Sequence, residues 1–365
     1  MSDENSSDNK NTEKMNIKRR LMLQAGPGVL AAAAGVAAMS RSAQAAQNGG
    51  NFPAHKRWKL VFVNHVTTNP FFVPTQYGIQ DACSYFGCDY QWTGSETAVV
   101  GEMVNSMNTA IAGGASAIGI AIVDPTAFNA PTASALQAGI PVFAYNADAP
   151  ANSGNKRLAY IGQDLFKSGY QMGQKIVELV GSGHVGLFIA TPGQLNIQPR
   201  IDGAIAAIKA SGKPITYESI ATGATVDEEL PKIKAYYLGN QSVKGMFAVD
   251  AGSTEMCGQV IKEYGLDKKG VHGGGFDLVP RTLEYINDGY LDFTIDQQPY
   301  LQGFYTVMEM VMFLVSGGLV GPAEINTGLK FVTKDTVKPY LTTSTRYEGK
   351  TTKEEIVQRS GPIGS

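Results

Sequence analysis

Two runs of sequence decide the fold: residues 117–123 (AIGIAIV) and residues 139–145 (GIPVFAY). Each run is short and almost wholly apolar, which is typical of a strand buried on both faces of a sheet. Residues 126–137, between them, are predicted to form a helix. A buried strand, a helix and a second buried strand make the repeating unit of a parallel sheet covered by helices. The sequence therefore predicts an α/β fold.

The same alternation extends in both directions along the chain. Before this unit the sequence predicts strands at 59–64 (KLVFVN) and 89–92 and helices at 73–86 and 99–112, and after it a strand at 158–161. The pattern then restarts, with strands at 184–190, 215–220, 243–249 and 291–295 and helices at 164–180, 200–211, 228–238, 255–264, 280–287 and 299–315. Residues 271–276 lead into Asp277. Two series without a long linker predict two similar lobes, which suits a chain of 365 residues. The last helix is strongly apolar, but Glu309 interrupts it, which favours a buried helix over a membrane span.

The N-terminal segment is predicted to direct export. A polar leader (1–14) precedes the basic residues 18–20 (KRR), an alanine-rich stretch (21–39) and small residues suited to cleavage after Ala45. This order is typical of a secretory signal, and the paired arginines indicate the twin-arginine route, so residues 1–46 are interpreted as a signal peptide and the periplasm as the destination. An uncleaved anchor is the alternative. At the other end, residues 351–365 are predicted to form a polar tail.

Composition and motifs favour a binding protein over an enzyme. The net charge is −2, so no basic surface for nucleic acid is indicated. The four histidines are far apart, and no zinc spacing, P-loop or GxSxG motif occurs, so no metal, cofactor or catalytic residue is predicted. Residues 272–275 (HGGG) lack nucleotide-binding spacing and are interpreted as a tight turn. For Cys83, Cys88 and Cys257, buried thiols are favoured over a disulfide between the first two.

Polar and aromatic residues gather where the predicted strands end, and ligands of parallel sheets bind beyond those ends. Carboxylates and amides bind pairs of sugar hydroxyls, and an aromatic ring covers the C–H face of a sugar, so this set points to a monosaccharide. Structural roles remain open for single members: core packing for an aromatic ring, helix capping for an aspartate, and either lining the cleft or a structural role for His65. The set includes Asn69, Phe71, Phe72, Asp124, Asn146, Asp148, Thr191, Asp250, Asp277 and Gln297.

Residues 57–345 resemble the ribose- and galactose-type periplasmic binding proteins of ABC transporters, which have the type I solute-binding fold. The resemblance is carried by residues 69–72 (NPFF), 139–142 (GIPV), 275–277 (GFD), 287–289 (NDG) and 294–299 (TIDQQP). It implies two Rossmann-like lobes with parallel sheets, joined by a hinge of three crossing strands. The N-terminal lobe would comprise residues 57–161 and 298–325, and the C-terminal lobe residues 162–297 and 326–345.

The resemblance also implies a function. A monomeric receptor would bind a monosaccharide or polyol in the periplasm and deliver it to an ABC permease in the inner membrane. The alternative is a receptor that presents its ligand to a sensor kinase or a chemoreceptor.

Site residues carried over from the family come from both lobes. Asn69, Phe71 and Phe72 match its first-lobe contacts, and Asp250, Asp277 and Gln297 match contacts of the second half. Asn146 stands where the family often has an aspartate, and Gln198 lies near where it usually places an arginine. The family's Asp-Arg pair is replaced by Asn146-Ala147-Asp148, so a guanidinium is missing there, and Arg200 either replaces it or does not. Another pentose, a hexose and a sugar alcohol all remain candidate ligands besides ribose.

Overall fold

The computed structural model describes residues 52–319, 321–342 and 346–348. The predicted signal peptide (1–46) and polar tail (351–365) lie outside the described residues. Within the described part of the chain, no helix combines the length and the apolar character that crossing a membrane requires. Cys83, Cys88 and Cys257 are buried free thiols.

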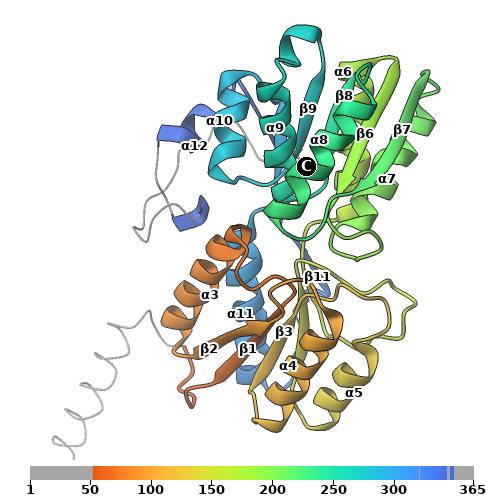
Figure 1. Cartoon of the computed structure of the whole chain (residues 1–365). Helices are drawn as coiled ribbons and strands as arrows, with labels where there is room; N and C mark the ends of the chain where they lie inside the picture. The colour runs from red at the N-terminus through yellow and green to blue at the C-terminus, as the bar shows by residue number, and fades with distance from the viewer. Residues whose placement is uncertain (1–51, 320, 343–345, 349–365) are drawn as a thin grey trace, which may run out of the picture. The chain divides into compact units, whose positions relative to one another are not determined.

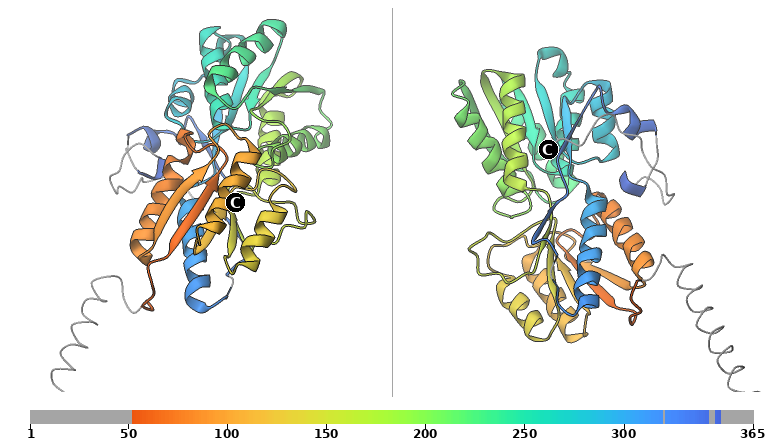
Figure 2. Two further views of the ribbon diagram at one scale, coloured as in Figure 1. Left: turned by 60° about the horizontal axis from the view of Figure 1, so that its bottom comes forward. Right: turned by 180° about the vertical axis from the view of Figure 1, so that it is seen from behind.

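The first sheet is built mainly from the N-terminal half of the chain (Figure 1). Its strands are β1 (Lys59–Asn64), β2 (Asp89–Gly94), β3 (Ala117–Ile120), β4 (Val142–Tyr145), β5 (Tyr160–Gly162) and β11 (Glu324–Asn326), all parallel, in the order β11-β5-β4-β3-β1-β2. Four helices cover it: α3 (Val73–Phe86), α4 (Val100–Ala112), α5 (Asn129–Gln137) and α11 (Pro299–Ser316). Helix α11 packs beside α3, far from it in sequence, and α4 packs beside α5 (Figure 2).

The second sheet repeats this plan. Its strands are β6 (Gly183–Ile189), β7 (Ile215–Ala221), β8 (Gly245–Ala248), β9 (His272–Phe276), β10 (Phe293–Asp296) and β12 (Lys330–Thr333), in the order β12-β10-β9-β8-β6-β7. Only β12 is antiparallel to its neighbour. The accompanying helices are α6 (Leu165–Val180), α7 (Gln198–Ala210), α8 (Val226–Gly239), α9 (Ala251–Glu263), α10 (Pro280–Asp288) and α12 (Lys338–Thr342). Both sheets thus follow one strand order, and the predicted fold class is confirmed.

Local differences from the prediction have simple causes. Residues 272–275 do not form a turn: they lie in β9, where the neighbouring core leaves no room for side chains. A Cβ at Gly274 would lie 2.7 Å from the Phe293 ring, and one at Gly275 would lie 2.2 Å from Thr254 Oγ1. Helix α9 begins four residues earlier than predicted, because Asp250 caps it. Strand β3 ends at Ile120, three residues earlier than predicted, and the next turn pairs Ile122 N with Ala147 O instead.

The chain passes between the two sheets three times, at residues 162–165, 296–299 and 326–330. The three passages are hydrogen-bonded to one another. Thr327 N donates to Gly162 O at 2.9 Å, Thr327 Oγ1 donates to Gln297 O at 2.8 Å, and Gln163 Nε2 donates to Gly328 O at 3.2 Å. These bonds make one narrow joint between the two sheets.

Candidate ligand-binding site

One pocket is lined from both sheets and from the joint between them. The first sheet and its loops contribute His65, Val66, Asn69, Phe71, Phe72 and Asn146, the second contributes Asn196, Ile197, Arg200, Asp250, Ala251 and Asp277, and the joint contributes Gln297. The pocket lies at the carboxyl ends of the strands, where parallel sheets bind their ligands. Of the residues predicted from sequence, the structure brings together Asn69, Phe71, Phe72, Asn146, Asp250, Asp277 and Gln297.

The aromatic wall follows β1. Asn69 Oδ1 accepts a hydrogen bond from Phe71 N at 2.9 Å and so caps the short 3-10 helix η1 (Pro70–Phe72). The Phe72 side chain is fully buried and packs edge-on against Phe71, with ring centroids 4.7 Å apart, and against His65 at 5.4 Å. Phe72 is therefore both a core residue and part of the pocket wall, whereas Phe71 is only partly buried. Phe71, the partly exposed ring of this pair, therefore presents an apolar surface to a ligand, and Phe72 supports it from the core.

Two polar residues of the pocket occupy equivalent, strained backbone positions. Asn146 directly follows β4 and Asp277 directly follows β9, the strand with the same place in the second sheet. Both residues have left-handed φ angles, 63° and 80°. Such conformations cost energy for residues other than glycine and gather at functional sites. Here they occur at the same position in each sheet and bring both residues into the pocket.

Both side chains are tied to their neighbours. Asn146 Nδ2 donates to Gln302 Oε1 at 3.2 Å, and Asp277 Oδ1 accepts from Gln297 Nε2 at 2.7 Å. The carboxylate of Asp277 is almost fully buried, and this burial raises its pKa to about 6, against an opposing effect of Arg200. Asp277 is therefore held in a defined orientation as an acceptor at neutral pH.

Arg200 supplies a guanidinium that the sequence left undecided. Its side chain is buried, donates from Nη1 to Val249 O at 2.9 Å and from Nη2 to Gln163 Oε1 at 3.1 Å, and stacks on Phe276 at 4.1 Å. Burial lowers its pKa, opposed by Asp277. Helix α6 packs closely against the backbone of Arg200 and so restrains its position. A Cβ at Gly169 of α6 would lie only 2.1 Å from Arg200 O. The placement of an arginine among the buried residues of α7 is the sequence signal that could have identified it.

Gln198 and Asp148, also expected in the site, do not reach this pocket. Gln198 is the first residue of α7, and its Oε1 accepts from Gly193 N at 2.8 Å while its Nε2 donates to Asp202 Oδ1 at 2.9 Å. Asp148 lies two residues beyond Asn146 and pairs with Arg157, which donates from Nε to Asp148 Oδ1 at 2.7 Å. In each case a local partner turns the side chain away from the pocket.

Asp250 combines the two roles that the sequence allowed. It caps α9, with Oδ1 accepting from Ser253 N at 2.9 Å, and its Oδ2 accepts from Ala190 N at 2.9 Å. Burial raises its pKa, while these backbone donors oppose the shift by favouring the charged form. The capping role and the pocket role are therefore compatible.

His65, for which the sequence left both a place in the cleft and a structural role open, and Asn196, which was not predicted, join the two halves of the pocket. Asn196 Nδ2 lies 3.1 Å from His65 Nε2, and burial lowers the pKa of His65 to about 3, so the imidazole is neutral. Two further bonds cross nearby, from Leu195 N to Val123 O at 2.9 Å and from Gln194 Nε2 to Ala98 O at 3.0 Å. The lobes are therefore in contact beside the pocket.

Three buried polar atoms of the pocket have no hydrogen-bond partner among the described residues: His65 Nδ1, Asn196 Oδ1 and Arg200 Nε. Buried polar groups are usually paired, so this cluster indicates that a polar ligand completes the site. The same part of the chain contains no group of three His, Cys, Asp or Glu side chains that could hold a metal ion.

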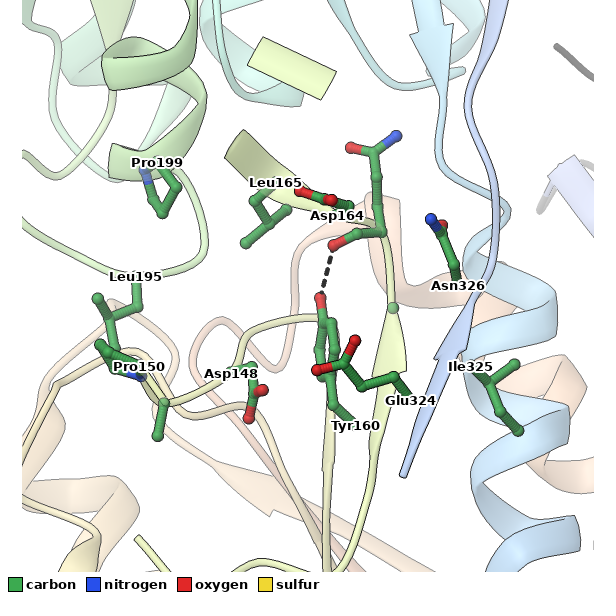
Figure 3. A pocket seen from close by; sticks show the side chains of 13 residues that line it. Asp148, Pro150, Tyr160, Asp164, Leu165, Leu195, Pro199, Glu324, Ile325 and Asn326 are labelled. Carbon is green, nitrogen blue, oxygen red and sulfur yellow. Dashed lines mark hydrogen bonds between the residues drawn. The ribbon is translucent and has the colours of Figure 1, made fainter. Parts of the chain in front are cut away.

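A second cavity is lined by residues 162–165 and 324–326 of the joint region together with Asp148, Tyr160 and Leu195, among others (Figure 3). It measures about 440 Å³, against about 60 Å³ for the pocket between the sheets. Its polar groups are largely engaged within the protein: Asp148 pairs with Arg157, Asp164 caps α6, and Tyr160 Oη donates to Gln163 O at 2.9 Å. Despite its smaller volume, the pocket between the sheets is the better candidate, because it combines an aromatic wall with unpaired polar atoms.

Two mainly parallel sheets, a triple joint and a polar pocket between them define a class of binding proteins, and a family model confirms it. Residues 60–318 match the periplasmic binding protein domain, so the chain belongs to that family. The xylose/arabinose-binding protein XylF of Sulfolobus acidocaldarius is 52% identical over 315 residues, which cover 83% of this chain and 77% of that protein.

Solved structures agree on the fold. An ABC transporter solute-binding protein from Burkholderia graminis, determined in complex with D-arabinose, superposes with a TM-score of 0.72 at 25% identity and covers 78% of this chain and 98% of its own. GanP, a glucose-galactose binding protein from Geobacillus stearothermophilus, has a TM-score of 0.70 at 23% identity and covers 77% of this chain and 99% of its own.

Proposed function

We propose that this protein is an exported receptor that binds one pentose, xylose or arabinose, between its two lobes and delivers it to an ABC permease. The observation that carries the proposal is the pocket itself, in which two aspartate carboxylates, a buried guanidinium and an aromatic wall converge from both sheets. The 52% identity to a xylose/arabinose-binding protein supports a pentose as the ligand.

The pocket chemistry suits a neutral polyhydroxylated ligand. Asp250 and Asp277 accept hydrogen bonds from hydroxyl groups, while Arg200 Nε and His65 Nδ1 donate to hydroxyl or ring oxygens. Bonds to ionised partners are the stronger ones, so the aspartates and the arginine contribute most. Phe71 and Phe72 cover the C–H face of the sugar and exclude water. Binding requires no bond to break, so we expect the sugar to be released unchanged.

Binding is coupled to closure of the lobes in this proposal. We assign residues 57–161 with 298–325 to one lobe and residues 162–297 with 326–345 to the other. The lobes rotate about the triple joint, and the cross-bonds from Asn196 and Leu195 belong to the closed form. In the cell, a twin-arginine signal would place the protein in the periplasm as a monomer, where the closed form docks on the permease. A sensor kinase or chemoreceptor is the alternative partner.

Titration calorimetry of the mature chain tests the ligand. D-xylose, L-arabinose, D-ribose, D-galactose and xylitol would be titrated in parallel. We expect one site per chain and the tightest binding for xylose or arabinose. Binding of none of these compounds would overturn the proposed ligand class. Pull-down of the sugar-loaded protein with its genomic neighbours would then separate a permease partner from a sensor kinase.

Two residues of α7 provide a matched comparison for the position of the site. Arg200→Lys keeps the charge but removes the planar set of donors, and we expect at least tenfold weaker binding. Gln198→Ala lies two positions earlier, with its amide engaged by Gly193 and Asp202, and should bind as the wild type does. The reverse result would place the sugar outside this pocket.

A further inference from the structure

A buried carboxyl group that does not line the pocket, that of Glu229, lies near Asp250. Glu229 lies in the first turns of α8, and its side chain is almost fully buried, at 3% exposure. Ser253 Oγ lies 3.4 Å from Glu229 Oε1 and 2.8 Å from Thr222 Oγ1. Ser253 links the two carboxyl groups, because its N also donates to Asp250 Oδ1 at 2.9 Å. Glu229 itself does not line the pocket.

The backbone is shaped to admit this carboxyl group. A Cβ added at Gly252, in the first turn of α9, would lie 2.2 Å from Glu229 Oε2, so only glycine leaves room for it. Yet Oε2 has no hydrogen-bond partner among the described residues. A proton on the Glu229 carboxyl group would turn this unpaired oxygen into a donor, and the nearby carboxylate of Asp250 is an acceptor for it.

The hydrogen bonds decide which group carries it. Asp250 accepts two backbone N–H bonds, from Ala190 and Ser253, and these favour its ionised form. Glu229 accepts only the long bond from the Ser253 hydroxyl. Arg200, in the pocket beyond Asp250, also favours a charge on Asp250. The proton therefore belongs on Glu229.

We propose that Glu229 is a positioning residue that donates its carboxyl proton to Asp250 and holds that carboxylate in the pocket as an acceptor for the sugar. This inference rests on the proposed function, because it gives Asp250 a ligand to bind. Other ionisable or polar groups around Glu229 are Ser253 and Glu255 on α9, Thr222 after β7, and Cys257. None of these groups is a cation that could stabilise an ionised Glu229.

The pH dependence has a definite sign. Burial, followed by the charge of Asp250, raises the pKa of Glu229 to about 9. Above that pH the proton leaves, two neighbouring carboxylates are both charged, and Asp250 loses its proposed donor. If sugar binds only when Glu229 is protonated, the dissociation constant is unchanged up to about pH 8 and about tenfold higher at pH 10.

Sugar titrations at pH 7 to 10 compare three variants with the wild type. Glu229→Gln keeps a donor and cannot ionise, so its affinity should equal that of the wild type at pH 7 and should not change with pH. Glu229→Ala has no donor and should bind at least several-fold more weakly at pH 7. Glu228→Gln changes the neighbouring exposed acid, which bonds to Ala224 N, and should follow the wild type at every pH. Equal affinity of Glu229→Ala and wild type, or a profile shared by Glu229→Gln and wild type, would overturn the positioning role.

A measurement without sugar separates this inference from the proposed function. The folded-state pKa of Glu229 lies above its unfolded value of 4.5, so its contribution to stability is full below 4.5 and is lost as the pH rises toward 9. As the pH rises from 5.5 to 8.5, the melting temperature of Glu229→Gln minus that of the wild type should therefore increase by several degrees. A constant difference would show that Glu229 holds no proton. If the wild type binds no sugar but the melting difference depends on pH as expected, the proposed function and the positioning role are overturned. The proton on Glu229 is then still established.

Discussion

Removal of the Asp277 carboxylate should separate affinity from stability. In the structure Asp277 Oδ1 accepts from Gln297 Nε2 at 2.7 Å, and the remaining acceptor positions face the pocket. A hydrogen bond to a charged group contributes about 1.5–3 kcal/mol, so loss of one or two sugar bonds in Asp277→Ala costs about 3 kcal/mol. This corresponds to a dissociation constant on the order of 100-fold higher. Asp277→Asn, which keeps one acceptor, should lose about tenfold.

The stability of Asp277→Ala should not decrease together with its affinity for sugar. Burial raises the pKa of Asp277 from 3.8 to about 6, so its contribution to stability is full below 3.8 and is lost as the pH rises through 6. At pH 7.5 the ionised form therefore costs about 3 kcal/mol of folding free energy. Asp277→Ala removes that cost and should unfold at an equal or higher denaturant concentration.

Calorimetry and urea unfolding measured on the same preparations provide the assay. Arg57→Ala is a suitable control, because Arg57 makes an exposed ion pair with Asp89 far from the pocket. It should change neither property by more than about 0.5 kcal/mol. Affinity of Asp277→Ala within twofold of the wild type would refute the argument, and so would a loss of affinity that merely parallels a loss of stability.

Three further outcomes are expected. Sugar affinity should be full near pH 7.5 and fall as the pH decreases through 6, because the sugar favours ionised Asp277. Calorimetry from pH 7.5 to 4.5 should show this trend in the wild type and not in Asp277→Asn. Gly169→Ala should weaken both stability and binding, because the added methyl group would lie 2.1 Å from Arg200 O. Gly101→Ala on α4, where nothing lies within 4 Å of the added methyl group, should instead stabilise the protein by about 0.5–1 kcal/mol. Equal effects of the two substitutions in urea unfolding would contradict the packing argument. Tyr160→Phe removes the hydrogen bonds from Tyr160 Oη to Asn146 O at 3.1 Å and to Gln163 O at 2.9 Å. The free energy of unfolding should fall by about 1–3 kcal/mol, and an unchanged value would show that these bonds do not stabilise the joint.

The fold was predictable because parallel strands covered on both faces must be apolar throughout. Residues 117–123 and 139–145 carry that signature, and Gly87 ends α3 in a left-handed conformation where the sequence placed the end of the helix. Strands β11 and β12 were not predicted. Each is only three or four residues long, and the β11 side chains are mostly exposed, so neither has the apolar signature. They reach their places in the two sheets only after the chain has passed through α11.

The candidate site was predictable only where a residue directly follows a strand. Asn146 and Asp277 meet that condition, and the geometry of a parallel sheet brings them to one edge. Arg200 depends instead on the loop before α7 and on the close approach of α6 at Gly169, which no spacing in the sequence specifies. For Gln198 and Asp148 the position along the chain was nearly right, but local hydrogen bonds, which the sequence did not reveal, turn the side chains elsewhere.

A crystal structure of the mature chain with D-xylose or L-arabinose tests the central claim most directly. The account predicts one pentose between the two sheets, with Asp250, Asp277 and Arg200 bound to its hydroxyl or ring oxygens and Phe71 against its C–H face. Sugar in the cavity beside Tyr160, or contacts from one sheet only, would contradict it.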